Sequence, residues 1–571
     1  MDLVRGRHQI AVGVNLIRVQ NNTISGFDEN GTFTFNGSFT GAPLADFMIG
    51  TVSDFQQTNP TPDNLRQWVM SFYVQDSFRI SPRFTLNYGL RWEPTFADPD
   101  KYGRGDSFNE SAFFADQVST VHPTAPAGLF FKGDPGIPAA MWNGHLANFA
   151  PRVGLVWSPH RDGRDTLRIG GALLYDSTET WFNERETTNP PFGNDIDVGS
   201  TGTLSNPWAG YAGGNPFPQA PGKLFFPSEG VYVNMPINPK PTNVAQWNVT
   251  YQRQLKGGWL ASASYLGNRT AHLWITEEVD PAEYMGTGST TKNTNQRRLL
   301  YLSNPALGKE YSSIDTMDDG AVSHYEAMLL SIQHRFANNY TFNANYTDSY
   351  CVSDYDFGAA LATPANSQPF NRHADWGPCI FDTRSIFNAS LVALSSWKSE
   401  NTWTSRLLSN WQLAPLFHVS SGQPLTVTTG HDDSLTDLNN DRPNQVMADV
   451  YSATQGCKSS PCVQWINPAA FVPNPTGTFG DVGRNSLRGP GTVNVDVALS
   501  RIFGITERFR VEARAEAFNI INHTNFVGGI SPAGTVAAFT TMNTNLSSSS
   551  FGQVQSAFDP RILEFALKIY F

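Results

Sequence analysis

The chain has 571 residues, of which 16% are charged and 12% aromatic, with 48 glycines, 37 prolines and a net charge of -11. This negative charge, without any basic block, argues against nucleic acid as a partner, and the composition favours strands and turns over helices. A mean hydropathy of -0.32 and the lack of an apolar stretch of about 20 residues exclude membrane-spanning helices, but membrane-spanning strands need only about ten alternating residues.

The first twenty residues, MDLVRGRHQIAVGVNLIRVQ, do not form a secretion signal, because no apolar core is followed by a small-residue cleavage site. From Gly6 to Val19 the residues alternate as in a strand that is already in progress. We therefore expect the chain to be the later part of a longer protein, truncated on its N-terminal side.

Apolar and polar residues alternate with a period of two through most of the chain, which is typical of strands with two different faces. In the segment 83–93, for example, every second residue from Phe84 to Trp92 is apolar and those between are mostly polar. The same pattern recurs at 67–78, 340–347, 492–503, 507–521 and 563–571. We count roughly sixteen to eighteen such segments, a number within the range of outer-membrane barrels.

Short and long connections alternate between these segments. Short turns are expected at 80–83, 159–164, 255–259, 336–340 and 503–507, and long Gly- and Pro-rich connections at 95–148, 177–242, 268–322, 430–489 and 523–559. Soluble sheets have no reason to lengthen every second connection, whereas outer-membrane barrels combine short periplasmic turns with long extracellular loops. The sequence therefore predicts an all-β fold, an antiparallel transmembrane β-barrel that forms one domain over residues 1–571. Lipid cannot hydrogen-bond a free strand edge, so such a wall should close on itself.

The four cysteines fall in two pairs on connections. Cys351 and Cys379 flank one of them, and Cys457 and Cys462 lie in the segment CKSSPC. Two loop disulfides in an oxidising compartment and four free thiols both fit this placement. Zinc fits less well, because neither pair has further His or Cys residues at ligand spacing.

One connection, HDDSLTDLNNDRPN at 431–444, concentrates hard oxygen ligands. These are Asp432, Asp433, Asp437, Asn439 and Asp441. They could hold a structural Ca²⁺ that stiffens an extracellular loop, but the segment lacks the central Gly and distal Glu of an EF-hand. A solvated acidic loop is the simpler interpretation, and the sequence indicates no other cofactor.

The segment 507–521 has one strongly charged face. That face carries Arg508, Arg510, Glu512, Arg514 and Glu516. In a barrel these side chains would face the lumen and contact a plug or a solute, unless they form a cross-strand charge network that stiffens the wall. No HExxH, GxSxG, P-loop or dinucleotide-binding motif is present, so we predict that the protein is not an enzyme.

Several segments taken together are similar to one family. They are FYVQDSFRISPRFTLNYGLRWEP, NFAPRVGLVWSP, AQWNVTYQRQL, ASYLGNRTAHL, HYEAMLLSIQHRF, FGDVGRNSLRGPG and FRVEARAEAFNIINHTNF. As a set they resemble the barrel of Oar-like TonB-dependent receptors, over nearly the whole chain. The resemblance implies an outer-membrane protein that binds or takes up a bulky ligand, opened by energy that the TonB complex relays from the inner membrane.

Three features expected of that family are not found in the sequence: a signal peptide, a TonB box, and a plug or carboxypeptidase-regulatory-like module ahead of the barrel. Such transporter barrels have about 22 strands around a plugged lumen, so we expect this chain to be part of a larger barrel. The leading hypothesis is a receptor or transporter barrel for a bulky nutrient or chelate in the bacterial outer membrane, in contact with lipid. The alternatives are a non-transporting adhesin or structural barrel, and an open porin.

Overall fold

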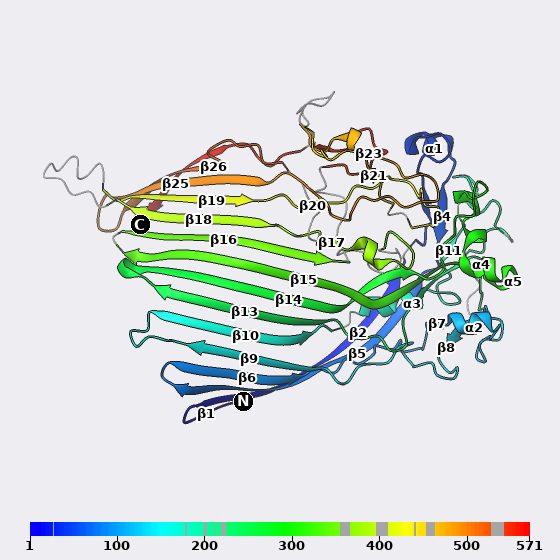
Figure 1. Cartoon of the computed structure of the whole chain (residues 1–571), viewed down its shortest axis with the longest axis horizontal. Coiled ribbons are helices and arrows are strands. Elements are labelled where there is room, and N and C mark those ends of the chain that lie inside the picture. The colour runs from blue at the N-terminus through cyan, green and yellow to red at the C-terminus, as the bar shows by residue number, and fades with distance from the viewer. Residues whose placement is uncertain are drawn as a thin grey trace.

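The computed structural model describes residues 1–26, 28–177, 180–198, 202–211, 213–217, 224–337, 339–354, 366–395, 409–438, 441–452, 463–526, 542–554 and 556–571. Its main feature is an antiparallel meander, which we call the wall, that runs along the long axis of the molecule (Figure 1). In chain order the wall strands are β1 (Asp2–Arg5), β2 (His8–Ser25), β5 (Thr61–Ser81), β6 (Phe84–Trp92), β9 (Phe149–Trp157), β10 (Asp165–Tyr175), β13 (Asn243–Gln254), β14 (Trp259–Glu278), β15 (Tyr311–Ala337), β16 (Tyr340–Ser353), β18 (Ser385–Leu394), β19 (Trp411–Ser420), β25 (Thr492–Gly504), β26 (Arg510–Phe518) and β28 (Ile562–Tyr570). With β3 (Thr32–Thr34), β4 (Asp54–Gln57), β11 (Ile196–Asp197), β12 (Gly230–Asn234) and β17 (Gly377–Pro378) they form one 20-stranded sheet. Among the described strands of this sheet only β12 and β15 pair in parallel, and the wall itself confirms the all-β antiparallel prediction.

The short turns predicted from the sequence lie at one end of the wall, and the predicted long connections lie at the other (Figure 1). Strand β5 ends at Ser81 and β6 begins at Phe84, as expected, and the turns at 159–164, 255–259 and 336–340 also join neighbouring strands. The turn between β13 and β14 passes through Gly257 and Gly258 with φ of 73° and 84°, which glycine adopts without steric cost. The predicted rhythm of short and long connections is therefore present.

Three strand boundaries differ from the sequence prediction. Strand β26 begins at Arg510, because the N–H groups of Ile505 and Thr506 both donate to the Phe509 carbonyl and so close a turn ahead of the ladder. Arg508 therefore lies in that turn and not in the strand. Strands β14 and β15 extend into the connection expected at 268–322, where register shifts near Leu273 let the pairing continue.

The two faces of the wall differ as the alternation predicted. Large apolar side chains on one face remain exposed, with 40% of Val249, 38% of Leu499 and 79% of Phe565 accessible. Exposing such apolar side chains to water costs free energy, whereas contact with an apolar phase such as lipid does not. The sheet thus has an apolar face suited to lipid and an opposite polar face.

The predicted closure is not present in the backbone pairing of the described residues. Strand β28 pairs with β26, β1 pairs with β2, and no ladder joins β28 to β1 or β2. The residues of β28 are exposed on both faces.

The long connections pack into a second layer at one end of the wall, which we call the cap (Figure 1). Besides the short strands of the main sheet named above, the cap contains β7 (Asp106–Phe108), β8 (Leu129–Phe131), β20 (Pro424–Leu425), β21 (Asn444–Gln445), β22 (Val463–Gln464), β23 (Phe471–Val472), β24 (Leu487–Arg488) and β27 (Gln553–Val554), and the helices α1 (Pro43–Ile49), α2 (Glu110–Phe114), α3 (Thr180–Thr187), α4 (Leu299–Ser303) and α5 (Pro305–Gly308). None of the helices in the described ranges is long and apolar enough to span a membrane.

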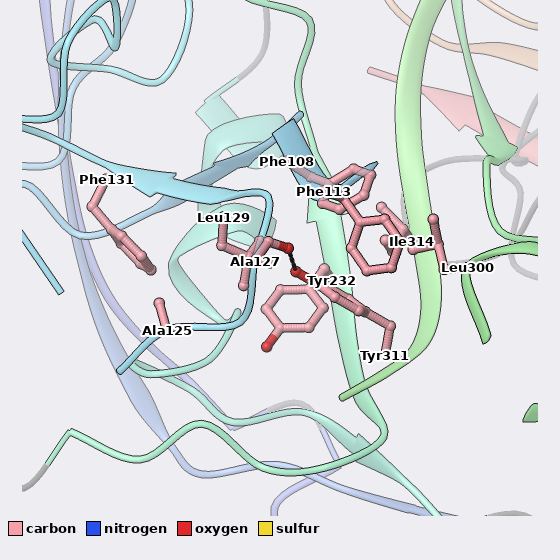
Figure 2. Packing of buried hydrophobic residues seen from close by; sticks show 10 residues of the cluster. All are labelled: Phe108, Phe113, Ala125, Ala127, Leu129, Phe131, Tyr232, Leu300, Tyr311 and Ile314. Atoms are coloured by element: carbon pink, nitrogen blue, oxygen red, sulfur yellow. Dashed lines mark hydrogen bonds between the residues drawn. The ribbon is translucent and has the colours of Figure 1, made fainter. Parts of the chain in front are cut away.

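The largest hydrophobic clusters lie in the cap and not under the wall. One of them joins Phe113, Leu129, Tyr232, Tyr311 and their neighbours (Figure 2). The Tyr311 hydroxyl donates to the Ala127 carbonyl at 2.5 Å, which satisfies a polar group inside this core. Connections expected to be polar loops are therefore folded around buried cores.

Candidate functional site: the polar wall face and the cap

Strand register assembles the polar face from alternate residues of successive strands. Asn388 on β18 donates to Asn345 on β16 at 3.2 Å and also lies 2.8 Å from the ring nitrogen of His418 on β19. On β10, Arg168 donates to Gln252 of β13 at 2.6 Å. Side-chain hydrogen bonds thus cross the strands on this face.

The predicted charged ladder lies on the same face. Its members on β26 are Arg510, Glu512, Arg514 and Glu516, whereas Arg508 precedes the strand. Arg514 forms an ion pair with Glu516 at 2.5 Å, and the Tyr570 hydroxyl donates to Glu512 at 2.6 Å. The ion pair lies within β26, and the contact that crosses to β28 comes from an uncharged hydroxyl, so a cross-strand charge network remains a prediction. A direct contact with a plug or solute also remains a prediction.

The polar face contains a hollow of about 920 Å³ in its earlier half, which we call the wall hollow. Its polar lining consists mainly of Tyr73, Gln75, Asn87, Arg91, Arg152, Gln246, Asn248 and Asn268. Register places Gly154 between Asn87 and Gly170, so two adjacent positions of the wall carry no side chain. Sequence reasoning missed this site, because each strand contributes only one or two small residues and their alignment depends on the pairing.

The cap contains a fully buried arginine. Arg298, 1% exposed, forms ion pairs with Glu278 at 3.5 Å and with Asp437, and donates to the Asp280 carbonyl at 2.9 Å. A buried cation is tolerated only when it is paired and hydrogen-bonded. Burial raises the pKa of Asp280 to about 8 and that of Asp437 to about 6, although the nearby Arg298 acts in the opposite direction on both. This one guanidinium thus joins the end of β14 to the segment that contains Asp437.

The acidic segment proposed for calcium lies between β20 and β21. Asp432 accepts from the N–H groups of Thr436 and Asp437, Asp441 accepts from the N–H of Ser434 at 2.6 Å, and Asp433 accepts through its carbonyl from Gly477. Asn439 lies outside the described residues. In the part of the chain that the structure describes, no three acidic, His or Cys side chains are placed to hold a metal ion. The calcium site therefore remains a prediction.

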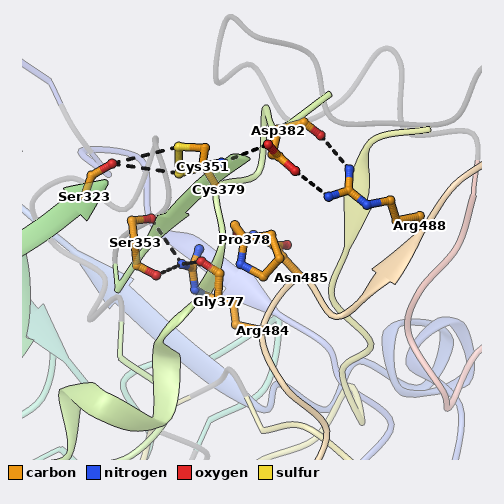
Figure 3. Close-up of a disulfide and its surroundings, with 10 residues drawn as sticks. All are labelled: Ser323, Cys351, Ser353, Gly377, Pro378, Cys379, Asp382, Arg484, Asn485 and Arg488. Carbon is orange, nitrogen blue, oxygen red and sulfur yellow. Dashed lines mark hydrogen bonds and ion pairs between the residues drawn. A yellow bond between two sulfur atoms is a disulfide. The ribbon is translucent and has the colours of Figure 1, made fainter. Parts of the chain in front are cut away.

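Cys351 and Cys379 form a disulfide with an S–S distance of 2.01 Å, shown in Figure 3. It ties the end of β16 to the residues after β17, and the Cys351 N–H donates to Asp382 at 3.0 Å. The other two cysteines, Cys457 and Cys462, lie outside the described residues.

The segment RNSLR at 484–488 holds this disulfide region in place (Figure 3). Arg484 donates to the Asp375 carbonyl at 2.6 Å and also to Ser353 and Gly377. Arg488 forms an ion pair with Asp382 and donates to its carbonyl at 2.8 Å. The sequence showed two arginines in a Gly-rich connection but gave no signal for their partners, which lie more than 100 residues earlier.

Solved structures similar to this chain include the outer membrane transporter YddB from Escherichia coli (10% identity, TM-score 0.47, covering 100% of this chain and 52% of that one). Another is a mutant of the ferric enterobactin receptor PfeA from Pseudomonas aeruginosa (11% identity, TM-score 0.44, covering 99% of this chain and 51% of that one). A third is the FrpB iron transporter from Neisseria meningitidis (9% identity, TM-score 0.42, covering 100% of this chain and 53% of that one). The chain spans about half the length of these structures, and no curated protein matches it. The model of the family described as outer membrane beta barrel domain matches residues 1–564, so this chain belongs to that family of outer-membrane β-barrels.

Proposed function

We propose that the chain is the barrel wall and extracellular cap of a TonB-dependent receptor or transporter that binds or takes up a bulky polar nutrient or chelate. The observation that carries this proposal is the pairing of an apolar outer face with a continuous polar face that is hollowed and donor-rich. A polar face on the side opposite to lipid lines the interior of a barrel, where it can bind a solute.

The packed cap favours a gated receptor over an open porin. Its segments share buried cores and the Arg298 network, so they form a folded layer across one end of the wall. In this role the protein does no covalent chemistry, and the TonB complex supplies the energy that moves ligand past the cap.

Growth experiments test the proposal. Strains with and without the gene, each with intact or deleted TonB, are grown on single nutrients from a panel of oligosaccharides, peptides and ferric chelates. We expect loss of growth on one nutrient when either the gene or TonB is removed. Unchanged growth on every nutrient with impaired surface attachment would indicate an adhesin, and steady ion conductance of the purified protein in a planar bilayer would indicate a porin.

A further inference from the structure

The wall hollow has an open floor at one of its glycines. A Cβ built on Gly154 would have no neighbour closer than 3.9 Å, so the space above this glycine is open. Beside it, a Cβ on Gly170 would lie 2.6 Å from the Asn248 side-chain oxygen, so this amide borders the open space. The Tyr73 ring lies farther along the hollow, over Gly13 of β2. The result is a small open floor bordered by side-chain amides, in a hollow whose volume lies inside the ~300–1,000 Å³ range of small-molecule sites.

The rim of the hollow is rich in groups that both donate and accept hydrogen bonds. The side-chain amides of Gln75, Asn87, Gln246, Asn248 and Asn268 each offer N–H donors and a carbonyl acceptor. A sugar hydroxyl likewise donates and accepts, so a polyhydroxylated ligand can satisfy this rim. An apolar ligand would leave the same amides unpaired at a cost of about 1–3 kcal/mol for each group.

The charges in the lining are separated, with Arg91 and Arg152 on β6 and β9 and the carboxylates of Asp2 and Asp76 on β1 and β5. Within the described strands β6, β9 and β10, the polar face carries Arg91, Arg152 and Arg168 and no carboxylate. Arg91 is paired with Glu93 just beyond the strand, and Arg168 donates to Gln252. Arg152 lies exposed in the lining of the hollow, where its guanidinium can reach a ligand carboxylate.

From this geometry we propose that the wall hollow binds an acidic oligosaccharide, with the sugar hydroxyls on the amide rim and a sugar carboxylate on Arg152. The proposal rests on the receptor function given above and names the ligand class of its wall. It requires no covalent step.

Calorimetric titration of the purified full-length receptor tests it, with an oligogalacturonate and a neutral galactose oligomer of equal length as probes. We expect Arg152→Gln to weaken binding of the acidic probe at least tenfold and to leave the neutral probe nearly unchanged. Gly154→Trp fills the open floor and should abolish binding of both probes. Ala414→Trp, on the polar face of β19 outside the hollow, is the matched control and should bind both probes as the wild type does.

Three outcomes would overturn the proposal: no binding of either probe at millimolar concentration, equal affinity for both probes, or undiminished binding by Gly154→Trp. If no sugar binds and Gly154→Trp instead lowers the melting temperature of the full receptor, the hollow seats a protein segment. A gene- and TonB-dependent nutrient whose uptake is unaffected by Gly154→Trp would reject this ligand class and leave the receptor function intact. If deletion of the gene changes the uptake of no nutrient, the receptor function is rejected. The titration would still show whether the hollow binds a sugar.

Discussion

Arg298 and Asp437 form an ion pair inside the cap although they lie 139 residues apart in the chain. The same guanidinium reaches Glu278 at the end of β14, so one side chain joins a wall strand to the cap segment between β20 and β21. Because the charge is removed from water, the pair matters more than a surface ion pair would.

Replacing this arginine should loosen the cap. We expect Arg298→Met to lower the free energy of unfolding of the cap by about 3–5 kcal/mol, because Glu278 and Asp437 lose their buried counter-charge. Limited proteolysis in detergent at increasing urea concentrations measures the change. Arg164→Ala is the control, since Arg164 and Asp162 form an exposed pair at 3.7 Å, and it should shift the midpoint very little. Equal midpoints for the two variants would contradict this role of Arg298.

The stability of the cap should depend on pH through its buried carboxyls. Burial raises the pKa of Asp280 and of Asp98 to about 8, far above the value near 4 in an unfolded chain. The folded cap therefore holds protons that the unfolded chain releases, and this contribution is fully present below about pH 4 and is lost as the pH rises toward 8. We expect the free energy of unfolding to fall by up to about 1.4 kcal/mol per pH unit for each group.

Denaturant titrations between pH 5 and pH 8 measure that slope. Asp280→Asn keeps a neutral side chain at every pH and should remove its share of the slope. A slope that is identical in the variant and the wild type would show that Asp280 does not bind a proton on folding.

The disulfide should stabilise the junction between β16 and the cap. Closing a loop with a sequence separation of 28 contributes about 3–4 kcal/mol in the chain-entropy model. We expect Cys351→Ser combined with Cys379→Ser to lower the melting temperature, and dithiothreitol to have the same effect on the wild type. If dithiothreitol lowers the melting temperature of the double variant as much as that of the wild type, reduction of the Cys351–Cys379 bond is not the cause of the change.

The two faces of the wall should differ in their tolerance of charge. Leu499 lies on the apolar face of β25, and its neighbour Ala498 lies on the polar face opposite Glu516. We expect Leu499→Arg to cost about 2–4 kcal/mol in a bilayer and Ala498→Arg to cost about 1 kcal/mol or less. Urea unfolding in lipid vesicles measures both variants. Equal costs would contradict the assignment of the two faces.

The alternation of residues predicted much of the wall, because side-chain direction in a strand follows a period of two and needs no distant partner. The faces of β6 and of β26 follow the expected pattern, apart from Arg508 in the turn. The cap was not predictable in the same way. Its loops looked polar and open, yet the Tyr311 hydroxyl donates to Ala127, 184 residues earlier in the chain.

The sequence by itself determined which side chains share a face, where the tight turns occur and that the chain resembles an outer-membrane barrel, since all of these follow from neighbours along the chain. Only the tertiary structure decided which glycines line up in the wall hollow, which carboxylates meet Arg298 and which carbonyls Arg484 holds. Those contacts depend on strand register and loop packing, which pair residues far apart in sequence and leave no local pattern to read.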